Sequence, residues 1–350
     1  MNSPVETIVT LSLLLIFPRL LVLSMRTLSA DPCDSTAQRD RRTLRSDQIT
    51  VLLNGYSESR IPLIQSISAT YTASPLVSSV LVLWGNPSTP HNILTQLAHN
   101  LSISSFGAAS ISIVRQPSSS LNARFLPRSY IKTHAVLICD DDVEVDPRSF
   151  EFAFWIWSSN RDRLIGFFAR SHDIDLSRKE WIYTVHPDKY SIILTKFMIL
   201  DSDYLYKYSC EGGPGMIEMR RTVDLMRNCE DILMNFVIAN ETNAGPILVG
   251  AKRVRDYGDA RNDHGDGDGD GDGDDNGRIG LKGEEQSMKV SEVGLSSRRK
   301  EHRKRRGECI RKFHSLLGKM PLRYSYGKVV NSVGEQGLCE KGGKLVFCDQ

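Results

Sequence analysis

HAVLICDDDVEV, residues 134–145, is the stretch that decides the fold. Its first six residues are mostly apolar, as in a buried strand, and Asp140, Asp141 and Asp142 follow directly. In open α/β sheets, ligand sites form outside the carboxyl ends of the strands. Burial in an apolar core cannot explain three adjacent carboxylates, so we expect them at such a strand end.

The three aspartates also predict a metal site. Adjacent carboxylates raise each other's pKa unless a positive charge lies between them. Oxygen ligands suit Mg²⁺ or Mn²⁺, and no Cys/His pattern indicates zinc. Such an ion takes one or two protein carboxylates and fills its other positions with water and phosphate oxygens. The cluster therefore predicts a divalent metal that holds a diphosphate; the alternative is a solvated turn that caps a helix beginning at Pro147.

Strand-like and helix-like segments alternate around this stretch. The predicted strands are 48–54, 77–84, 109–114, 134–139, 164–168 and 190–200. The predicted helices are 57–73, 91–100, 147–157 and 231–240. This alternation predicts an α/β domain with a mixed, mostly parallel central sheet flanked by helices.

The charge balance of the whole chain gives no argument for nucleic acid as a partner. The 350 residues contain 44 basic and 42 acidic side chains, a formal net charge of +2. The basic run 298–306 has no interleaved aromatics, which argues against nucleic acid; such a run is usually a solvated face, although it could neutralise a phosphate. Seven cysteines fit a large domain with one or two disulfides and some free thiols, and Cys339 and Cys348 are close enough in sequence to pair.

The ends and one insert differ in composition from the predicted domain, 48–330. Residues 1–30 predict either a cleaved signal peptide or a signal anchor, and 31–47 a polar stem. The Asp/Gly tract 263–277 cannot form a packed core, and it lacks the apolar residue that each calcium-binding β-roll repeat carries. Residues 331–350 form a C-terminal tail. The acceptor patterns at Asn100 and Asn240 predict N-glycosylation in a lumenal chain.

Ordered sequence blocks carry a family resemblance. They include NGYSESR (54–60), VLVLWGN (80–86), SLNARF (120–125), HAVLICDDDVEV (134–145) and NCEDILMNFVIAN (228–240). With these blocks the chain resembles glycosyltransferase family 64, the exostosin-like retaining transferases, over nearly all of 48–330. The resemblance implies a GT-A-type, Rossmann-like fold and a donor site at the aspartates.

The resemblance also implies roles for single residues. Asp142 is implied as the direct metal ligand, while Asp140 and Asp141 face the ribose and metal-bound water. The positions implied to surround the nucleotide or its diphosphate are Arg60, Asn86, Asn122, Arg124 and Arg306.

The block NCEDILMNF places the implied catalytic carboxylate at Asp231, beside the anomeric carbon. Glu230 departs from the aspartate of the family pattern, and His302 matches a further family position. The resemblance implies a disulfide between Cys229 and Cys309. Cys139, on the predicted strand, is expected to be a buried free thiol.

These features lead to one functional hypothesis and one alternative. We expect a Mn²⁺- or Mg²⁺-dependent retaining glycosyltransferase, anchored by its N-terminal segment or secreted, in the Golgi lumen. The short layout and the stretch DYGDARN (256–262) resemble the plant branch of the family. That branch implies GDP-mannose or a UDP-N-acetylhexosamine as donor, and a glycan or a glycosyl inositol phosphoceramide sphingolipid as acceptor. The alternative is a catalytically silent lumenal module that binds a metal or a glycan.

Overall fold

A computed structural model describes most of the chain. The described residues are 31–34, 41–105, 107–258, 299–331, 338–341 and 344–347. The predicted signal segment 1–30, the Asp/Gly tract 263–277 and Cys348 lie outside them. In the part of the chain that is described, no helix is both long and apolar enough to cross a membrane.

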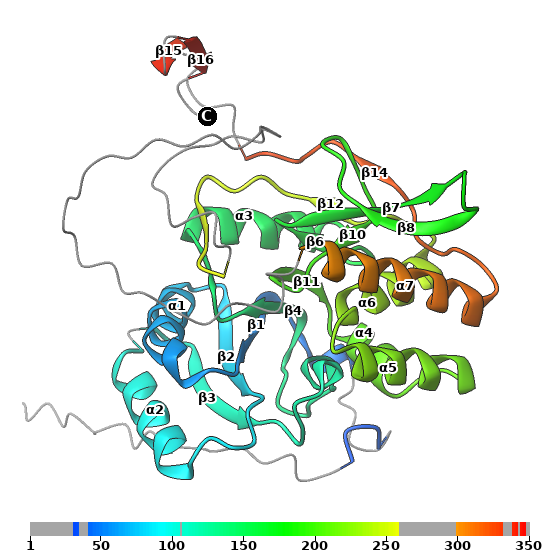
Figure 1. The fold of residues 1–350 in the computed structure, drawn as a ribbon. Coiled ribbons are helices and arrows are strands. Elements are labelled where there is room, and N and C mark those ends of the chain that lie inside the picture. The colour runs from blue at the N-terminus through cyan, green and yellow to red at the C-terminus, as the bar shows by residue number, and fades with distance from the viewer. Residues whose placement is uncertain are drawn as a thin grey trace, which may run out of the picture.

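A seven-stranded sheet forms the centre of the molecule (Figure 1). Its strands, in spatial order, are β12 (Ile247–Leu248), β6 (Ile165–Gly166), β11 (Phe197–Asp201), β4 (Thr133–Asp140), β1 (Arg45–Gly55), β2 (Val77–Trp84) and β3 (Ser110–Arg115). Of these strands, β11 alone runs antiparallel to its neighbours. The predicted class, a mixed and mostly parallel sheet flanked by helices, is confirmed.

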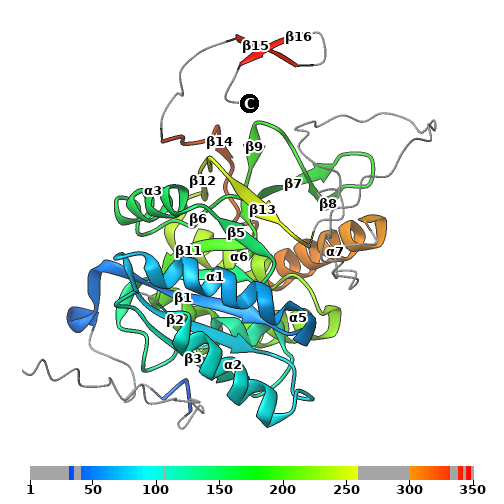
Figure 2. The ribbon, with the colours of Figure 1, turned by 90° about the vertical axis from the view of Figure 1, so that its left-hand side faces the viewer.

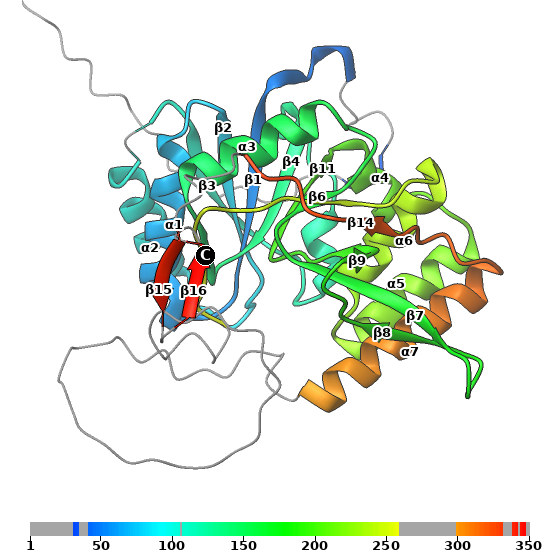
Figure 3. The ribbon, with the colours of Figure 1, turned by 90° about the horizontal axis from the view of Figure 1, so that it is seen from above.

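Helices cover both faces of the sheet, as Figure 3 shows. On one face lie α1 (Ile61–Ala73), α2 (His91–Ile103) and α3 (Pro147–Ser158). On the other lie α4 (Asp203–Ser209), α5 (Pro214–Met226), α6 (Glu230–Thr242) and α7 (Arg299–Leu317). Side chains of a strand point alternately to the two faces, so Val51 and Leu53 join one apolar core and Leu52 the other. This is why the central strands are apolar throughout.

Short antiparallel strands lie to one side of the central strands β1, β2 and β3, above them in Figure 2. They are β5 (Val143–Val145) with β13 (Val254–Asp256), β7 (Ala169–Asp175) with β8 (Glu180–Thr184) and β10 (Ile192–Ile193), and β9 (Lys189–Tyr190) with β14 (Ser325–Tyr326). The tail contains a hairpin of β15 (Leu338–Lys341) and β16 (Lys344–Phe347). Three 3₁₀ helices complete the description: η2 (Arg41–Thr43), η3 (Glu58–Arg60) and η4 (Leu121–Phe125).

Three predicted elements were wrong in extent. The strand predicted at 164–168 is shortened to β6, Ile165–Gly166. The strand predicted at 190–200 is divided between β9, β10 and β11, because the side-chain amide of Asn235 bonds both the N–H and the C=O of Ile193. That amide makes the hydrogen bonds that a neighbouring strand would otherwise make, so the chain can change direction here. The helix predicted at 57–73 begins at Ile61, after the separate 3₁₀ turn η3, with Pro62 in its first turn.

The segment predicted as a stem contacts the domain. Cys33 forms a disulfide with Cys210 at the end of α4, which the sequence did not predict. Arg41 forms ion pairs of 3.1 Å with Asp201 and 2.7 Å with Asp203, and β1 begins at Arg45. Residues 31–34 and 41–47 therefore pack with the folded body rather than standing apart from it.

Candidate functional site

The aspartate cluster lies where β4 ends. Asp140 is the last residue of β4 and pairs in register with Asn54 of β1, so both side chains emerge at the same edge of the sheet. The chain then turns into β5, which pairs with β13. Asp141 is only 4% exposed. The parallel sheet thus gathers the polar ends of its strands at one position, as expected for this class of fold.

Two arginines neutralise the cluster. Arg60, which ends η3 after β1, lies 2.8 Å from Oδ1 of Asp141 and 3.1 Å from Oδ2 of Asp142. Arg124, from η4, lies 3.1 Å from Oδ1 of Asp140. Because all five side chains are half-buried or buried, these pairs are little screened by solvent. Arg60 and Arg124, two of the residues predicted to surround the donor, therefore meet the aspartates here.

Asp142 has the environment of a metal ligand. Its Oδ1 is buried and has no hydrogen-bond partner among the described residues. Burial, and then the charge of Asp140, raise the pKa of Asp142 to about 7, with Arg60 opposing the shift. A bound cation would satisfy the oxygen and reverse that shift, so the carboxylate fits a hard divalent ion.

The rest of the cluster does not form an all-protein metal cage. The described residues contain no group of three or more His, Cys, Asp or Glu side chains arranged to hold a metal ion. A metal at Asp142 would therefore depend on water and phosphate oxygens for most of its ligands. Gly258 packs against this carboxylate: a Cβ there would lie 2.2 Å from Oδ2 of Asp142. A Cβ at position 258 would therefore force the Asp142 carboxylate to move.

The second half of the site lies at the start of α6. Arg306 of α7 contacts Oδ2 of Asp231 at 2.5 Å and Oδ1 of Asn228 at 3.0 Å, and its guanidinium lies 4.5 Å from the ring centroid of Tyr183. Asp231 and Arg306 are 3% and 5% exposed. The arginine holds the predicted catalytic carboxylate in one orientation.

The predicted disulfide between Cys229 and Cys309 is confirmed, and it fixes this pair of helices. Cys229 precedes α6 in the left-handed conformation, with φ of 79°, while Cys309 follows Arg306 by less than one turn of α7. The covalent link therefore holds Arg306 beside the first turn of α6. Cys139 is a buried free thiol, as predicted.

Arg124 joins the two halves. Besides Asp140 it contacts Oε1 of Glu230 at 3.3 Å, and that carboxylate also accepts a hydrogen bond of 3.2 Å from Thr195. Burial raises the pKa of Glu230, and Arg124 opposes the shift. One guanidinium thus connects the aspartates predicted to bind a metal with the residue beside Asp231.

Three of the residues predicted for the donor site lie at the margin of that site. Asn86 accepts a hydrogen bond from the N–H of Ser88 in the turn after β2. The amide of Asn122 bonds Tyr208, Asp224 and the carbonyl of Arg220, so it supports helices α4 and α5. His302 is half-buried one turn from Arg306; burial, and then Arg306, lower its pKa to about 4. Their predicted contacts with a donor stay predictions.

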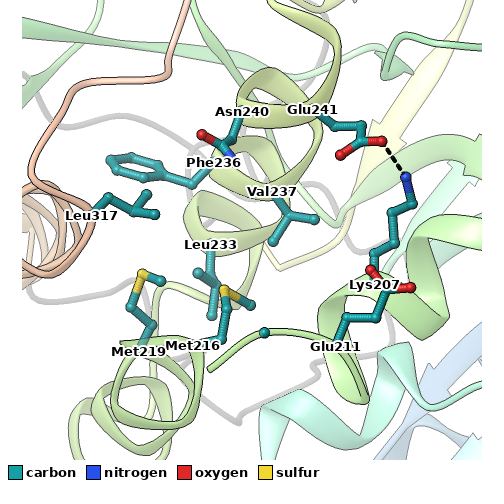
Figure 4. Close-up of a pocket in the computed structure, with 11 residues that line it drawn as sticks. Lys207, Glu211, Met216, Met219, Leu233, Phe236, Val237, Asn240, Glu241 and Leu317 are labelled. Carbon is teal, nitrogen blue, oxygen red and sulfur yellow. Dashed lines mark hydrogen bonds and ion pairs between the residues drawn. The ribbon is translucent and has the colours of Figure 1, made fainter. Parts of the chain in front are cut away.

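A cavity of about 140 Å³ lies between α4, α5, α6 and α7 (Figure 4). Met216, Leu233 and Val237 line it, and the ion pair between Lys207 and Glu241 lies beside it. Asn240, another lining residue, is nine positions after Asp231, which places the two on opposite faces of α6. The cavity is therefore behind the helix and apart from the aspartate site.

Comparison with known proteins identifies the chain. The model described as "Glycosyl transferase family 64 domain" matches residues 49–334. The chain belongs to glycosyltransferase family 64. The "Glycosyltransferase family protein 64 C3" of Arabidopsis thaliana is 66% identical over 93% of this chain and 93% of its own length. The "Glycosylinositol phosphorylceramide mannosyl transferase 1" of the same plant is 28% identical over 85% of this chain and 80% of its own.

A weaker likeness is to a solved structure. A crystal structure of GalNAc-T7 with UDP, GalNAc and Mn²⁺ aligns with a TM-score of 0.39 and 11% identity over 55% of this chain and 40% of that chain. A likeness this weak carries no argument about the site. The family assignment confirms the resemblance that the sequence blocks indicated.

The structure adds residues to this family 64 site that the sequence did not predict. They are Tyr183 and Asn228 around Arg306, Thr195 beside Glu230, and the ion pair between Lys196 and Asp256. Asn228 stands in the quoted block NCEDILMNF and could have been noticed there. The others lie in loops or short strands whose local pattern carries no signal.

Proposed function

We propose that this family 64 protein is a metal-dependent retaining glycosyltransferase of the Golgi lumen. It transfers mannose or an N-acetylhexosamine from a nucleotide diphosphate to a glycan or to a glycosyl inositol phosphoceramide. The observation that carries the proposal is the meeting of two carboxylate groups at Arg124, with Asp140 on one side and Glu230 on the other. A donor that spans this arginine would reach both the metal ligand and the catalytic carboxylate.

Four residues of the chain have distinct proposed roles. Asp142 would hold a Mn²⁺ or Mg²⁺ ion, which neutralises charge on the leaving diphosphate when bound. Arg306 and Arg124 add fixed positive charge in a buried site, where such charges act strongly on a developing anion. Asp231, buried at the start of α6, is held by Arg306. There it stabilises positive charge that develops on the transferred sugar, or attacks the anomeric carbon.

The choice of acceptor rests on relatives. The relative named as a glycosylinositol phosphorylceramide mannosyl transferase aligns with most of this chain. Two disulfides in the described residues support an oxidising compartment, where such bonds persist. Mannose is the first donor sugar to test, followed by the N-acetylhexosamines.

Nucleotide release tests the proposal. We would incubate the purified full chain with Mn²⁺ and each common UDP- and GDP-sugar, and measure free nucleotide by chromatography. One donor should release nucleotide, and Asp142→Asn should slow that release about a hundredfold or more, because a buried metal ligand is lost. Asp188→Asn, which removes an exposed acid outside the site, should match the wild type.

Other results of this experiment would indicate a different function. No nucleotide from any donor would contradict the enzyme; Mn²⁺ binding that Asp142→Asn weakens would then support the silent binding module. Release of inorganic phosphate in place of a nucleoside diphosphate would indicate a phosphohydrolase. A thermal-shift screen identifies the donor independently, since a ligand of the native state raises the midpoint by mass action.

A further inference from the structure

The cavity behind α6 is a feature that the proposed function leaves unused (Figure 4). Its volume of about 140 Å³ is below the roughly 300–1,000 Å³ of pockets that take a drug-sized ligand, so a nucleotide sugar does not fit. Buried Leu233 and Met219 and half-buried Met216 give it an apolar lining. Methionine side chains adapt their shape to what they contact. The cavity therefore suits a small, partly apolar group.

Asn240 lies at the solvent end of this lining. Leu233, Phe236 and Val237 precede it by seven, four and three positions, so all four side chains share one face of α6. Leu233 and Phe236 are buried, Val237 is half-buried and Asn240 is exposed. The side-chain amide of Asn240 makes no hydrogen bond to another described residue. It is the free polar end of an apolar stripe that leads into the cavity.

The rim around Asn240 is polar. Glu241 is exposed and forms an ion pair of 2.5 Å with Lys207 of α4. The carboxylate accepts hydrogen bonds and the ammonium donates them, so both suit the hydroxyl groups of a sugar. Asn240 is also the acceptor in the pattern Asn240-Glu241-Thr242, which the secretory pathway modifies.

We propose that Asn240 carries an N-linked glycan whose first N-acetylglucosamine covers this cavity. In the modification, the anomeric carbon of that sugar loses its bond to a lipid-linked diphosphate and forms one to Nδ2 of Asn240, which gives up a proton. An oligosaccharide transferase of the host catalyses the step on the nascent chain. The inference rests on the lumenal location in the proposed function.

The attached sugar stabilises the folded chain by covering apolar surface. Its acetamido methyl group and the C–H face of its ring lie against the lining, while its hydroxyl groups face the rim and the solvent. The covalent link gives the sugar a high effective concentration at the cavity, so weak contacts suffice to keep it there. The glycan is thus a structural part of the packing between α4, α5, α6 and α7.

Mass spectrometry tests whether Asn240 is modified. The full chain, made in the secretory pathway of a host with high-mannose glycans, would be treated with peptide N-glycosidase F in heavy-oxygen water. The label should appear at position 240, persist in Thr242→Ser and be absent in Thr242→Ala. A bare Asn240 would overturn the inference. Because no donor or acceptor of this enzyme is used, that result is separate from failure of glycosyl transfer.

Calorimetry tests whether the first sugar packs on the protein. Endoglycosidase H trims each glycan to one N-acetylglucosamine. The trimmed Asn100→Gln chain should unfold about 2 °C or more above the double variant Asn100→Gln with Asn240→Gln. The trimmed Asn240→Gln chain is the matched control, because Asn100 lies on α2, outside the cavity lining. It should unfold with the double variant.

A change in the lining tests the contact itself. Val237→Thr makes the rim polar at nearly constant volume, so in the Asn100→Gln background it should at least halve the gain from the trimmed sugar. No gain from the sugar at Asn240, an equal gain from a sugar at Asn100, or an undiminished gain in Val237→Thr would overturn the proposal.

Discussion

At the scale of single residues, two arginines organise the site. Arg124 holds Asp140 and Glu230 together, and Arg306 holds Asp231 and Asn228 while it stacks on Tyr183. A planar guanidinium presents several donors in fixed directions, which a lysine ammonium cannot do. Both arginines are therefore specific to their positions rather than interchangeable positive charges.

The buried pair of Arg306 and Asp231 leads to a stability prediction. Arg306→Ala should lower the free energy of unfolding by roughly 3–5 kcal/mol, since it leaves a buried carboxylate without its partner. Asp231→Asn should lower it less and should abolish sugar transfer. Urea unfolding followed by circular dichroism measures both.

The double variant separates charge from packing. If the uncompensated charge of Asp231 is the cause, adding Asp231→Asn to Arg306→Ala should recover part of the lost stability. A double variant that is less stable than Arg306→Ala would contradict this explanation.

At the scale of secondary-structure elements, side chains join segments whose backbones are not paired. Asn235 of α6 binds the backbone of β10, as described above. His172 of β7 stacks on Tyr324 with ring centroids 4.6 Å apart, and its Nδ1 lies 2.8 Å from the hydroxyl of Ser191. The hairpin of β7 and β8, the segment joining β9 to β10 and the segment after α7 are thereby held in one unit.

His172 gives this unit a pH dependence. Burial lowers the pKa of His172 to about 4, with Lys189 and Arg323 adding to the shift and Asp173 opposing it. The unfolded chain then binds more protons than the folded chain between pH 6.5 and 4, so stability rises with pH in this window and is lost as pH falls. The largest loss from His172 is roughly 3 kcal/mol. His302, with its pKa lowered to about 4, acts in the same direction.

The substitution His172→Phe tests the assignment. It keeps an aromatic ring against Tyr324 and removes the titrating group. The rise in urea midpoint from pH 4.5 to pH 7 should be smaller for this variant than for the wild type. Equal pH dependence in both proteins would show that His172 is not the group responsible.

At the scale of the whole molecule, two disulfides connect distant parts of the chain. Cys229 and Cys309 are 80 residues apart and link α6 to α7. Cys33 and Cys210 are 177 residues apart and attach the N-terminal segment to the end of α4. The first supports the site directly, and the second determines where the chain enters the domain.

Loss of the N-terminal disulfide should destabilise the domain without disabling the site. Cys33→Ser should lower the free energy of unfolding by about 2–4 kcal/mol, because the bond restricts the unfolded chain. Donor-dependent nucleotide release at low temperature should be retained. Denaturant unfolding measures the change, and Cys33→Ser with Cys210→Ser should match the single variant. A single variant as stable as the wild type would contradict the predicted contribution.

The sequence by itself determined the elements whose signal is local. Val77–Trp84 has the predicted bounds, because a mostly apolar run between turn residues describes a strand buried on both faces. The three aspartates were predicted at a strand end for the same reason: charge following an apolar run marks the edge of a core. Family blocks added Asp231, Arg306 and the disulfide between Cys229 and Cys309.

The tertiary structure decided everything that depends on residues distant in the chain. Only the fold shows that Arg124 joins Asp140 to Glu230, that Asn235 interrupts a predicted strand, and that Cys33 pairs with Cys210. Periodicity reports how one segment divides its side chains between core and solvent. It carries no information on which segments meet, because those pairings are selected by the packing free energy of the whole sheet and its two layers of helices.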